Sequence, residues 1–187
     1  KVFPGETEWD KHQRAKTGPL KEQNLAFKNL GKLKFEDVSK EWGLDHVGMS
    51  YASTAADLDR DGDLEIITAN LDEEVSIYQN NSANKNKILV ELVGTLSNPN
   101  GIGSTIRIIV GKSKQSRYVT LSRGYMSSGE AISHFGLGTE EKINELSVQW
   151  PSGHVQIFKN LDVNQFYTIT EPGKEAQSIP KKETEKL

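Results

Sequence analysis

The sequence has 187 residues, enough for one domain of ordinary size or two small ones, and for a core that needs no covalent staples. Its 23 basic and 26 acidic side chains give a formal net charge of −3, with no broad basic surface of the kind that binds nucleic acid. No cysteine is present, which excludes a disulfide framework and a thiolate metal site, and no apolar run is long enough to span a bilayer.

The first part of the chain, residues 1–23, is polar and mixed in charge, with prolines and glycines along it. We expect a lead-in segment with little regular structure. No signal peptide is recognisable and the sequence begins with Lys1, so we expect a mature or excised piece, in which an absent signal carries little weight.

Short strand-like runs follow along residues 24–171. Several of them, such as 106–110 and 146–150, alternate β-branched or aromatic residues with polar ones, which is typical of strands. Turn-forming residues separate the runs, and no long amphipathic helix is evident. The sequence therefore predicts an all-β protein. The residues expected to share a face are Ile106, Ile108 and Val110 in one run, and Leu146, Val148 and Trp150 in the other.

A polar linker at residues 81–87 divides the strands into two groups, 24–81 and 87–171. The second group has six or so strands, enough to close a β-sandwich of its own. The last residues, 172–187, are charged and contain proline, so we expect a disordered tail. We expect the lysines of the linker and the tail to be solvated: Lys85, Lys87, Lys181 and Lys182.

The stretch "DLDRDGDLE" places five acidic side chains at alternating positions, where like charges repel one another unless something neutralises them. Calcium takes six to eight oxygen ligands, and loops that wrap it use positions one, three, five and seven. A carboxylate at position nine can close the shell in a loop that joins two strands. Gly62, at position six, allows the sharp turn. The candidate ligands are Asp57, Asp59, Asp61, Asp63 through its backbone carbonyl, and Glu65.

The acidic stretch has other interpretations. An EF-hand is excluded because position twelve, where it needs a glutamate, is Thr68, and because the flanks are typical of strands. An acidic turn in solvent without a metal remains open. A Mg²⁺-dependent hydrolase is disfavoured, since Mg²⁺ prefers one or two carboxylates and open water positions.

The stretch "DLDRDGDLEIITAN" resembles the calcium loop of FG-GAP/VCBS repeats, the blades of integrin-like β-propellers, and "VSIYQNN" is similar to their closing strand. Downstream, "GIGSTIRI", "SRGYMSSGEAISHFGLG" and "LSVQWPSGHVQ" resemble the ASPIC/UnbV domain. The resemblance implies one calcium-binding, four-stranded antiparallel blade at 24–81, followed by an ASPIC/UnbV-like sandwich at 87–171. It implies the same five ligands, although the repeat more often has Asp where this chain has Glu65. A lone blade leaves an apolar face open to water, so we expect it to pack on the sandwich or on another copy of the chain.

No enzyme site is expected. His134 is the best candidate base, but no nucleophile pattern accompanies it, and Phe135 and Leu137 indicate a strand packed into a core. Ser127 and Ser128 lack the strand–turn–helix context of a nucleophile elbow.

We therefore expect a non-enzymatic, extracytoplasmic calcium-binding module that supports adhesion or recognition of an unknown protein or carbohydrate ligand, without nucleic acid and without membrane insertion. It could form a homo-oligomer or pack within a larger propeller. The alternative is an accessory carbohydrate-binding domain of a larger carbohydrate-active enzyme, in which Trp150 or Tyr125 touches sugar. For Trp150, a place in the core is the favoured interpretation.

Overall fold

The computed structural model describes residues 7–10, 12, 21–81, 85–173 and 181–182. Strands dominate these residues, which confirms the predicted all-β class. Among them no helix is both long and apolar enough to cross a membrane. The expectations for the lead-in segment and the tail fall mostly outside the described residues.

Fifteen strands are described, and several are only two or three residues long. In chain order they are β1 (Glu22–Gln23), β2 (Phe27–Gly31), β3 (Lys34–Asp37), β4 (Val47–Gly48), β5 (Ser50–Ala56), β6 (Glu65–Asn70), β7 (Ser76–Tyr78), β8 (Asn86–Val93), β9 (Thr105–Val110), β10 (Ser113–Tyr118), β11 (Ile132–Gly138), β12 (Lys142–Gln149), β13 (Val155–Asp162), β14 (Gln165–Thr170) and β15 (Lys181–Lys182).

The chain divides into two compact units. The first unit comprises Lys1–Ser53 and Ile67–Tyr78, and the second comprises Thr54–Ile66 and Gln79–Leu187. The acidic loop therefore groups with the C-terminal strands, although it precedes the 81–87 linker in the sequence.

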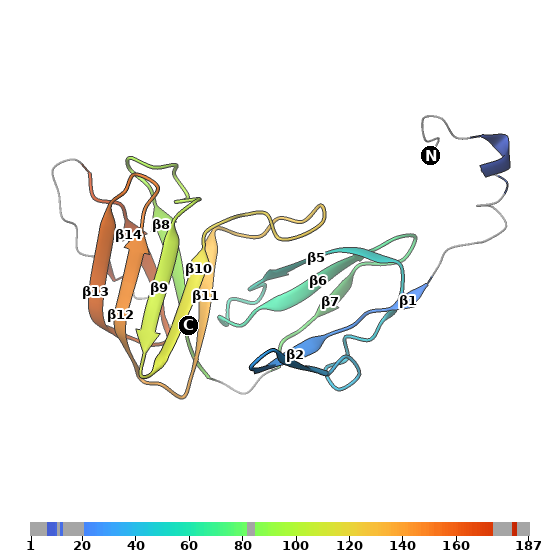
Figure 1. The fold of residues 1–187 in the computed structure, drawn as a ribbon, viewed down its shortest axis with the longest axis horizontal. Coiled ribbons are helices and arrows are strands. Elements are labelled where there is room, and N and C mark those ends of the chain that lie inside the picture. Colours follow the sequence, from blue (N-terminus) through green and yellow to red (C-terminus); the bar gives the residue numbers. More distant parts are fainter. Residues whose placement is uncertain (1–6, 11, 13–20, 82–84, 174–180, 183–187) are drawn as a thin grey trace. The chain divides into compact units, whose positions relative to one another are not determined.

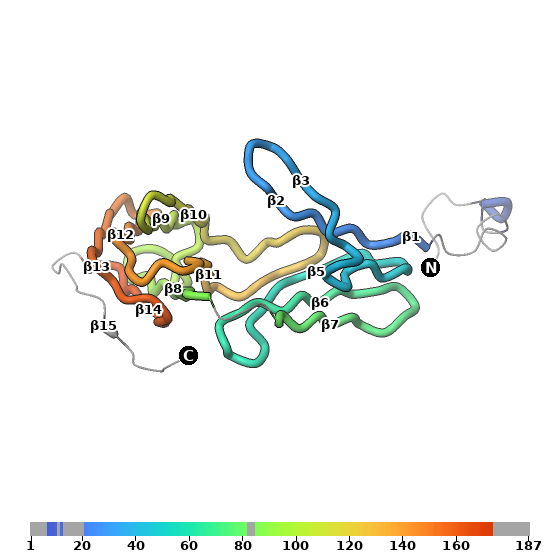
Figure 2. Tube along the Cα trace, turned by 90° about the horizontal axis from the view of Figure 1, so that it is seen from below, coloured from blue at the N-terminus to red at the C-terminus, as the bar shows by residue number. Residues whose placement is uncertain are grey.

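Among the described residues that precede the linker, the strands form small sheets (Figures 1 and 2). β1 pairs with β4, β2 pairs with β3 as an antiparallel hairpin, and β5, β6 and β7 form a three-stranded sheet. The single four-stranded sheet expected for residues 24–81 is thus wrong in this detail. A two-residue turn at Lys32 and Leu33 joins β2 to β3, and β2 pairs with no other strand. The hairpin therefore adds no strand to the β5–β7 sheet.

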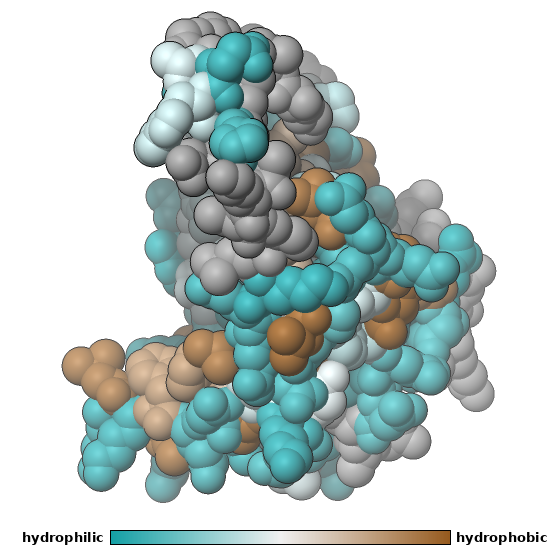
Figure 3. Space-filling model, turned by 90° about the vertical axis from the view of Figure 1, so that its right-hand side faces the viewer, coloured by the Kyte–Doolittle hydropathy of each residue, from teal (hydrophilic) through white to brown (hydrophobic). Residues whose placement is uncertain are grey.

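Large apolar side chains are exposed on the β2–β3 hairpin, and Leu33 at its turn is 93% exposed. Phe27, Leu30 and Phe35 on its strands are more than half exposed. Figure 3 shows hydrophobic residues interspersed with hydrophilic ones on the face in view. A two-stranded hairpin without a covered face contributes little stability of its own.

Two four-stranded sheets make up the C-terminal part, in the orders β10-β9-β12-β13 and β11-β8-β14-β15 (Figure 1). Neighbouring strands are antiparallel except β8 and β14, which run parallel. Parallel neighbours need a long crossover connection, and here β9 to β13 supply it.

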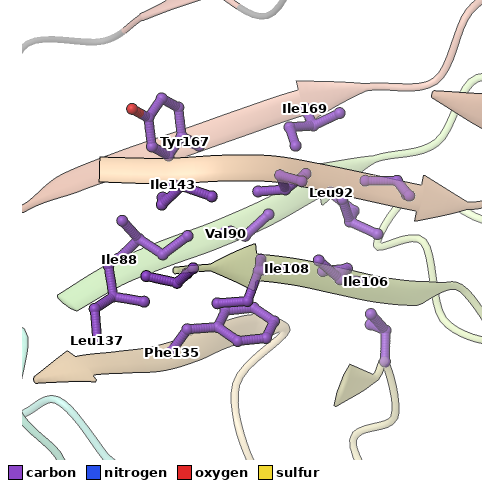
Figure 4. Close-up of a cluster of buried hydrophobic side chains, with 14 of the residues drawn as sticks. Ile88, Val90, Leu92, Ile106, Ile108, Phe135, Leu137, Ile143, Tyr167 and Ile169 are labelled. Atoms are coloured by element: carbon purple, nitrogen blue, oxygen red, sulfur yellow. The ribbon is translucent and has the colours of Figure 1, made fainter. Parts of the chain in front are cut away.

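One hydrophobic core lies between these two sheets, which makes them a β-sandwich (Figure 4). The faces predicted from the alternation are confirmed, because Ile108 pairs with Leu146 and Ile106 pairs with Val148 in the β9–β12 register. The opposite sheet supplies alternate residues from β8 and from β11. The buried core residues are Ile88, Val90, Leu92, Ile106, Ile108, Val110, Val119, Phe135, Leu137, Ile143, Leu146, Val148, Trp150, Tyr167 and Ile169.

A buried carboxylate fixes the end of β14 to the loop that follows β8. Glu171 is 1% exposed, and its Oε2 accepts hydrogen bonds from the backbone N–H groups of Thr95, Leu96 and Ser97 at 2.7 to 3.0 Å. Its Oε1 accepts from the hydroxyls of Ser97 and Ser152 at 2.8 and 2.5 Å. Five donors thus compensate for the desolvation of one charge.

Candidate metal centre

The acidic stretch forms a tight loop between β5 and β6. Two of its residues have left-handed backbone conformations, Arg60 with φ of 60° and Gly62 with φ of 86°. Such residues reverse the local direction of the chain, so alternate side chains no longer point along a straight strand. The loop backbone therefore lets side chains at alternate positions converge.

Three carboxylates of this loop come together. Asp57, Asp59 and Asp61 each offer an oxygen, and the three oxygens lie within 4.8 Å of one another. Calcium–oxygen distances are about 2.3–2.6 Å, so two oxygens on opposite sides of one ion are separated by at most about 5 Å. The spacing of the three oxygens therefore fits a single calcium ion, and the donors are of the hard oxygen type that calcium prefers.

Asp57 is the most enclosed of the three. Its Oδ2 accepts a hydrogen bond from the backbone N–H of Gly62 at 3.0 Å, whereas its Oδ1 is buried without a hydrogen-bond partner. Burial raises the pKa of the Asp57 carboxyl, and the Gly62 N–H and the charge of nearby His134 oppose this shift. A buried carboxylate oxygen without a donor costs free energy, which a cation at this position would recover.

Hydrogen bonds within the loop hold the other two aspartates. Asp61 Oδ1 accepts from the backbone N–H of Asp63 at 2.8 Å, and Asp59 Oδ1 accepts more weakly from that of Asp61 at 3.3 Å. Both side chains are exposed, so solvent and ions reach the cluster from this side.

Glu65 is not part of the group of three but lies buried at the base of the loop. Its Oε2 accepts from the backbone N–H of Leu58 at 2.9 Å, and its Oε1 lies 3.4 Å from the backbone N of Asn80. Glu65 thus closes the two ends of the loop on each other. Its service as a calcium ligand stays a prediction, as does that of the Asp63 carbonyl.

Lys87 was expected to be solvated, and this expectation is wrong. The side chain of Lys87 contacts the acidic loop, a contact that the sequence did not predict. Its Nζ lies 3.1 Å from Asp63 Oδ1, and the two side chains are only 14% and 21% exposed. The alkyl chain of Lys87 passes over Gly62. A Cβ atom added to Gly62 would lie only 2.6 Å from Cε of Lys87. The sequence around Lys87 is that of a polar linker, and it does not indicate the ion pair with Asp63.

A second polar contact ties the same part of the chain to the sandwich loops. Thr54 Oγ1, at the end of β5, donates a hydrogen bond to the backbone carbonyl of Ser128 at 3.1 Å. Together with the Lys87–Asp63 pair, it gives a physical reason for the grouping of residues 54–66 with the C-terminal strands.

The other candidate residues lie in the C-terminal unit. His134 flanks the buried Phe135, as expected, and its Nε2 lies 2.9 Å from Glu130 Oε1. Trp150 is only 2% exposed, with Nε1 donating to Gln156 Oε1 at 2.6 Å, so it belongs to the core and offers no sugar platform. Tyr125 is 70% exposed on the β10–β11 loop.

Comparison with known proteins bears on the C-terminal part. No curated protein matches the chain. Residues 94–176 match the family described as ASPIC and UnbV, and this range covers the sandwich from the end of β8 to beyond β14. This match supports the resemblance to the ASPIC/UnbV domain predicted for the C-terminal part.

Proposed function

We propose that this chain is a non-enzymatic calcium-binding module of the extracytoplasmic space, which supports adhesion or recognition. Two observations on one loop carry the proposal: oxygens of Asp57, Asp59 and Asp61 lie within 4.8 Å of one another, and Oδ1 of the Asp57 carboxylate is buried without a hydrogen-bond partner. The proposed ligand set is completed by the Asp63 carbonyl and by Glu65.

The role of the ion in this proposal is structural. Calcium tolerates irregular geometry and many carboxylates, whereas Mg²⁺ keeps several waters and takes one or two carboxylates. Bound at the loop, calcium neutralises side chains that otherwise repel one another. Loops of this kind in extracellular modules bind with dissociation constants of about 10⁻⁴–10⁻³ M, a range that is filled outside cells.

The same proposal assigns residues 24–81 to the FG-GAP/VCBS type of repeat. Supporting this assignment are the position of the acidic loop between two paired strands and the left-handed Gly62 within it. The ASPIC/UnbV domain is then the sandwich that follows the repeat in the chain.

Calcium titration tests the proposal directly. We expect calorimetry to show one site per chain, and thermal melting to shift upward in calcium relative to chelator. A ligand that binds only the folded state stabilises it by about 2.7 kcal/mol at a hundredfold excess over its dissociation constant. Identical melting curves in calcium and in chelator, with no heat of binding, would refute the proposal.

A carbohydrate-binding role is the second candidate, and it now depends on Tyr125. The Tyr125 ring is exposed on a loop beside the likewise exposed Met126, where an aromatic face is free to stack on a sugar. Binding on a glycan array that Tyr125→Ala abolishes would favour this role. No binding by wild type would dismiss it.

A further inference from the structure

Lys87 is unusual among the described lysines because its ammonium group lies on the candidate metal loop. Its Nζ pairs with Asp63 Oδ1 at 3.1 Å, and both side chains are mostly buried. Its alkyl chain covers Gly62, at the centre of the loop. The loop therefore already contacts one positive charge that belongs to the chain itself.

The backbone of Lys87 is fixed independently of the loop. Lys87 pairs with Gly136 in the β8–β11 register, its N–H donates to Asn164 Oδ1 at 3.1 Å, and its carbonyl accepts from the Asn164 N–H at 2.7 Å. The pairing with Gly136 and the two hydrogen bonds with Asn164 hold the backbone of Lys87 in place. The ammonium group therefore contacts the loop from a fixed strand position.

The charged group in direct contact with Lys87 belongs to the loop. Asp63 is its direct partner, and the clustered carboxylates of Asp57, Asp59 and Asp61 lie on the same short segment. A unit positive charge close to several carboxylates lowers their mutual repulsion, and it also repels any divalent cation that approaches them.

We propose that Lys87 is a tethered cation, which holds the acidic loop together when no metal is bound and competes with calcium for it. This inference rests on the proposed calcium function of the loop. By occupying the Asp63 carboxylate, Lys87 leaves Asp63 to contribute its backbone carbonyl, and it weakens the site toward the affinity range of extracellular modules. Lys87 is thus a residue that sets the affinity of the loop without being a ligand.

The test compares three variants by calcium calorimetry and by melting in chelator. Lys87→Met removes the charge but keeps an alkyl chain over Gly62. Lys87→Arg keeps the charge, and Lys85→Met makes the same charge change at an exposed lysine two positions away.

For Lys87→Met we expect calcium binding about three- to tenfold tighter than wild type, because a repelling charge is removed. In chelator we expect the same variant to melt lower, on the order of 2–6 °C, because Asp63 is left buried without its partner. Lys87→Arg and Lys85→Met should resemble wild type in both measurements.

The calcium affinities of the variants test the role of Lys87 separately from the proposed function. Equal calcium affinity for Lys87→Met and Lys85→Met, with wild type binding normally, overturns the inference and leaves the proposed function intact. Binding by Lys87→Met but not by wild type supports Lys87 as the competing cation and counts against the proposed function of the natural chain. Absence of binding in every variant overturns both.

Discussion

Ser97 and Glu171 are joined twice, although 74 residues separate them in the chain: the Ser97 N–H donates to Glu171 Oε2 at 2.7 Å and its hydroxyl donates to Oε1 at 2.8 Å. Ser97 follows β8 and Glu171 follows β14, so the contact secures the same ends of two parallel strands. This carboxylate accepts five hydrogen bonds, and two predictions depend on it.

Glu171→Gln should destabilise the protein by about 3 kcal/mol at neutral pH. The substitution keeps the shape of the side chain but removes the charge, and it turns an amide N–H₂ toward groups that are themselves donors. Urea unfolding measures the loss. Glu141→Gln, at an exposed glutamate, should change the free energy of unfolding by less than about 0.5 kcal/mol. A similar small change in Glu171→Gln would contradict the prediction.

The same carboxylate should make the protein sensitive to acid. Burial alone would raise the pKa of Glu171, but the hydrogen bonds from Ser152, Ser97 and Leu96 lower it from 4.5 to about 2. Between these values the folded protein binds fewer protons than the unfolded chain, so stability is present above pH 4.5 and is lost as the pH falls toward 2.

Melting temperatures of wild type and Glu171→Gln should therefore converge as the pH falls from about 4.5 toward 2. Parallel curves, with a constant gap over this range, would show that another group carries the acid sensitivity.

Asp59→Ala should remove most calcium binding. Asp59 contributes one of the three clustered oxygens, and it makes only a weak hydrogen bond within the loop, so its loss removes a ligand with little other damage. We expect at least about a tenfold weaker calorimetric affinity, in line with the dependence of such sites on their number of charged ligands. Glu141→Ala is the control, and equal affinities of the two variants would reject the ligand assignment.

Gly62→Ala should destabilise the protein in chelator by more than Gly153→Ala does. Both glycines have left-handed φ values, 86° and 92°, so both variants carry the strain of a side chain in that region, about 1 kcal/mol. Only the Cβ at Gly62 meets another group, the alkyl chain of Lys87 at 2.6 Å, whereas the space around Gly153 is open. Unfolding in urea with chelator present compares the two, and equal losses would mean that Lys87 yields without cost.

Alternation within a strand proved sufficient to predict the faces of β9 and β12. Ile106 and Ile108 in β9 lie two positions apart, as do Leu146 and Val148 in β12, and all four are buried because one face of each strand packs on the core. The acidic loop could be located for a similar local reason: the spacing of Asp57, Asp59 and Asp61 is itself the signal.

Contacts between distant residues could not be predicted in this way. The parallel pairing of β8 with β14 depends on the order of strands in space, which no local pattern carries. Glu171 and Lys87 are ordinary charged residues in the sequence, and their roles come from donors and acceptors that the fold brings to them from elsewhere in the chain. The single four-stranded sheet predicted before the linker was wrong because short, exposed strands such as β2 and β3 pair locally.

The parallel pairing also determines how the sandwich responds to tension. β8 is its first strand and β14 its last before β15, and their register runs from Ile88 opposite Gln165 to Val93 opposite Thr170. Because the two strands run in the same direction, the chain enters at one end of this ladder and leaves at the other. A pull on the two ends therefore loads all the hydrogen bonds of the ladder in shear at once, instead of peeling them one by one. The Glu171 contacts at the exit reinforce the same ladder, so we expect the sandwich to resist extension when it is pulled at the start of β8 and the end of β14.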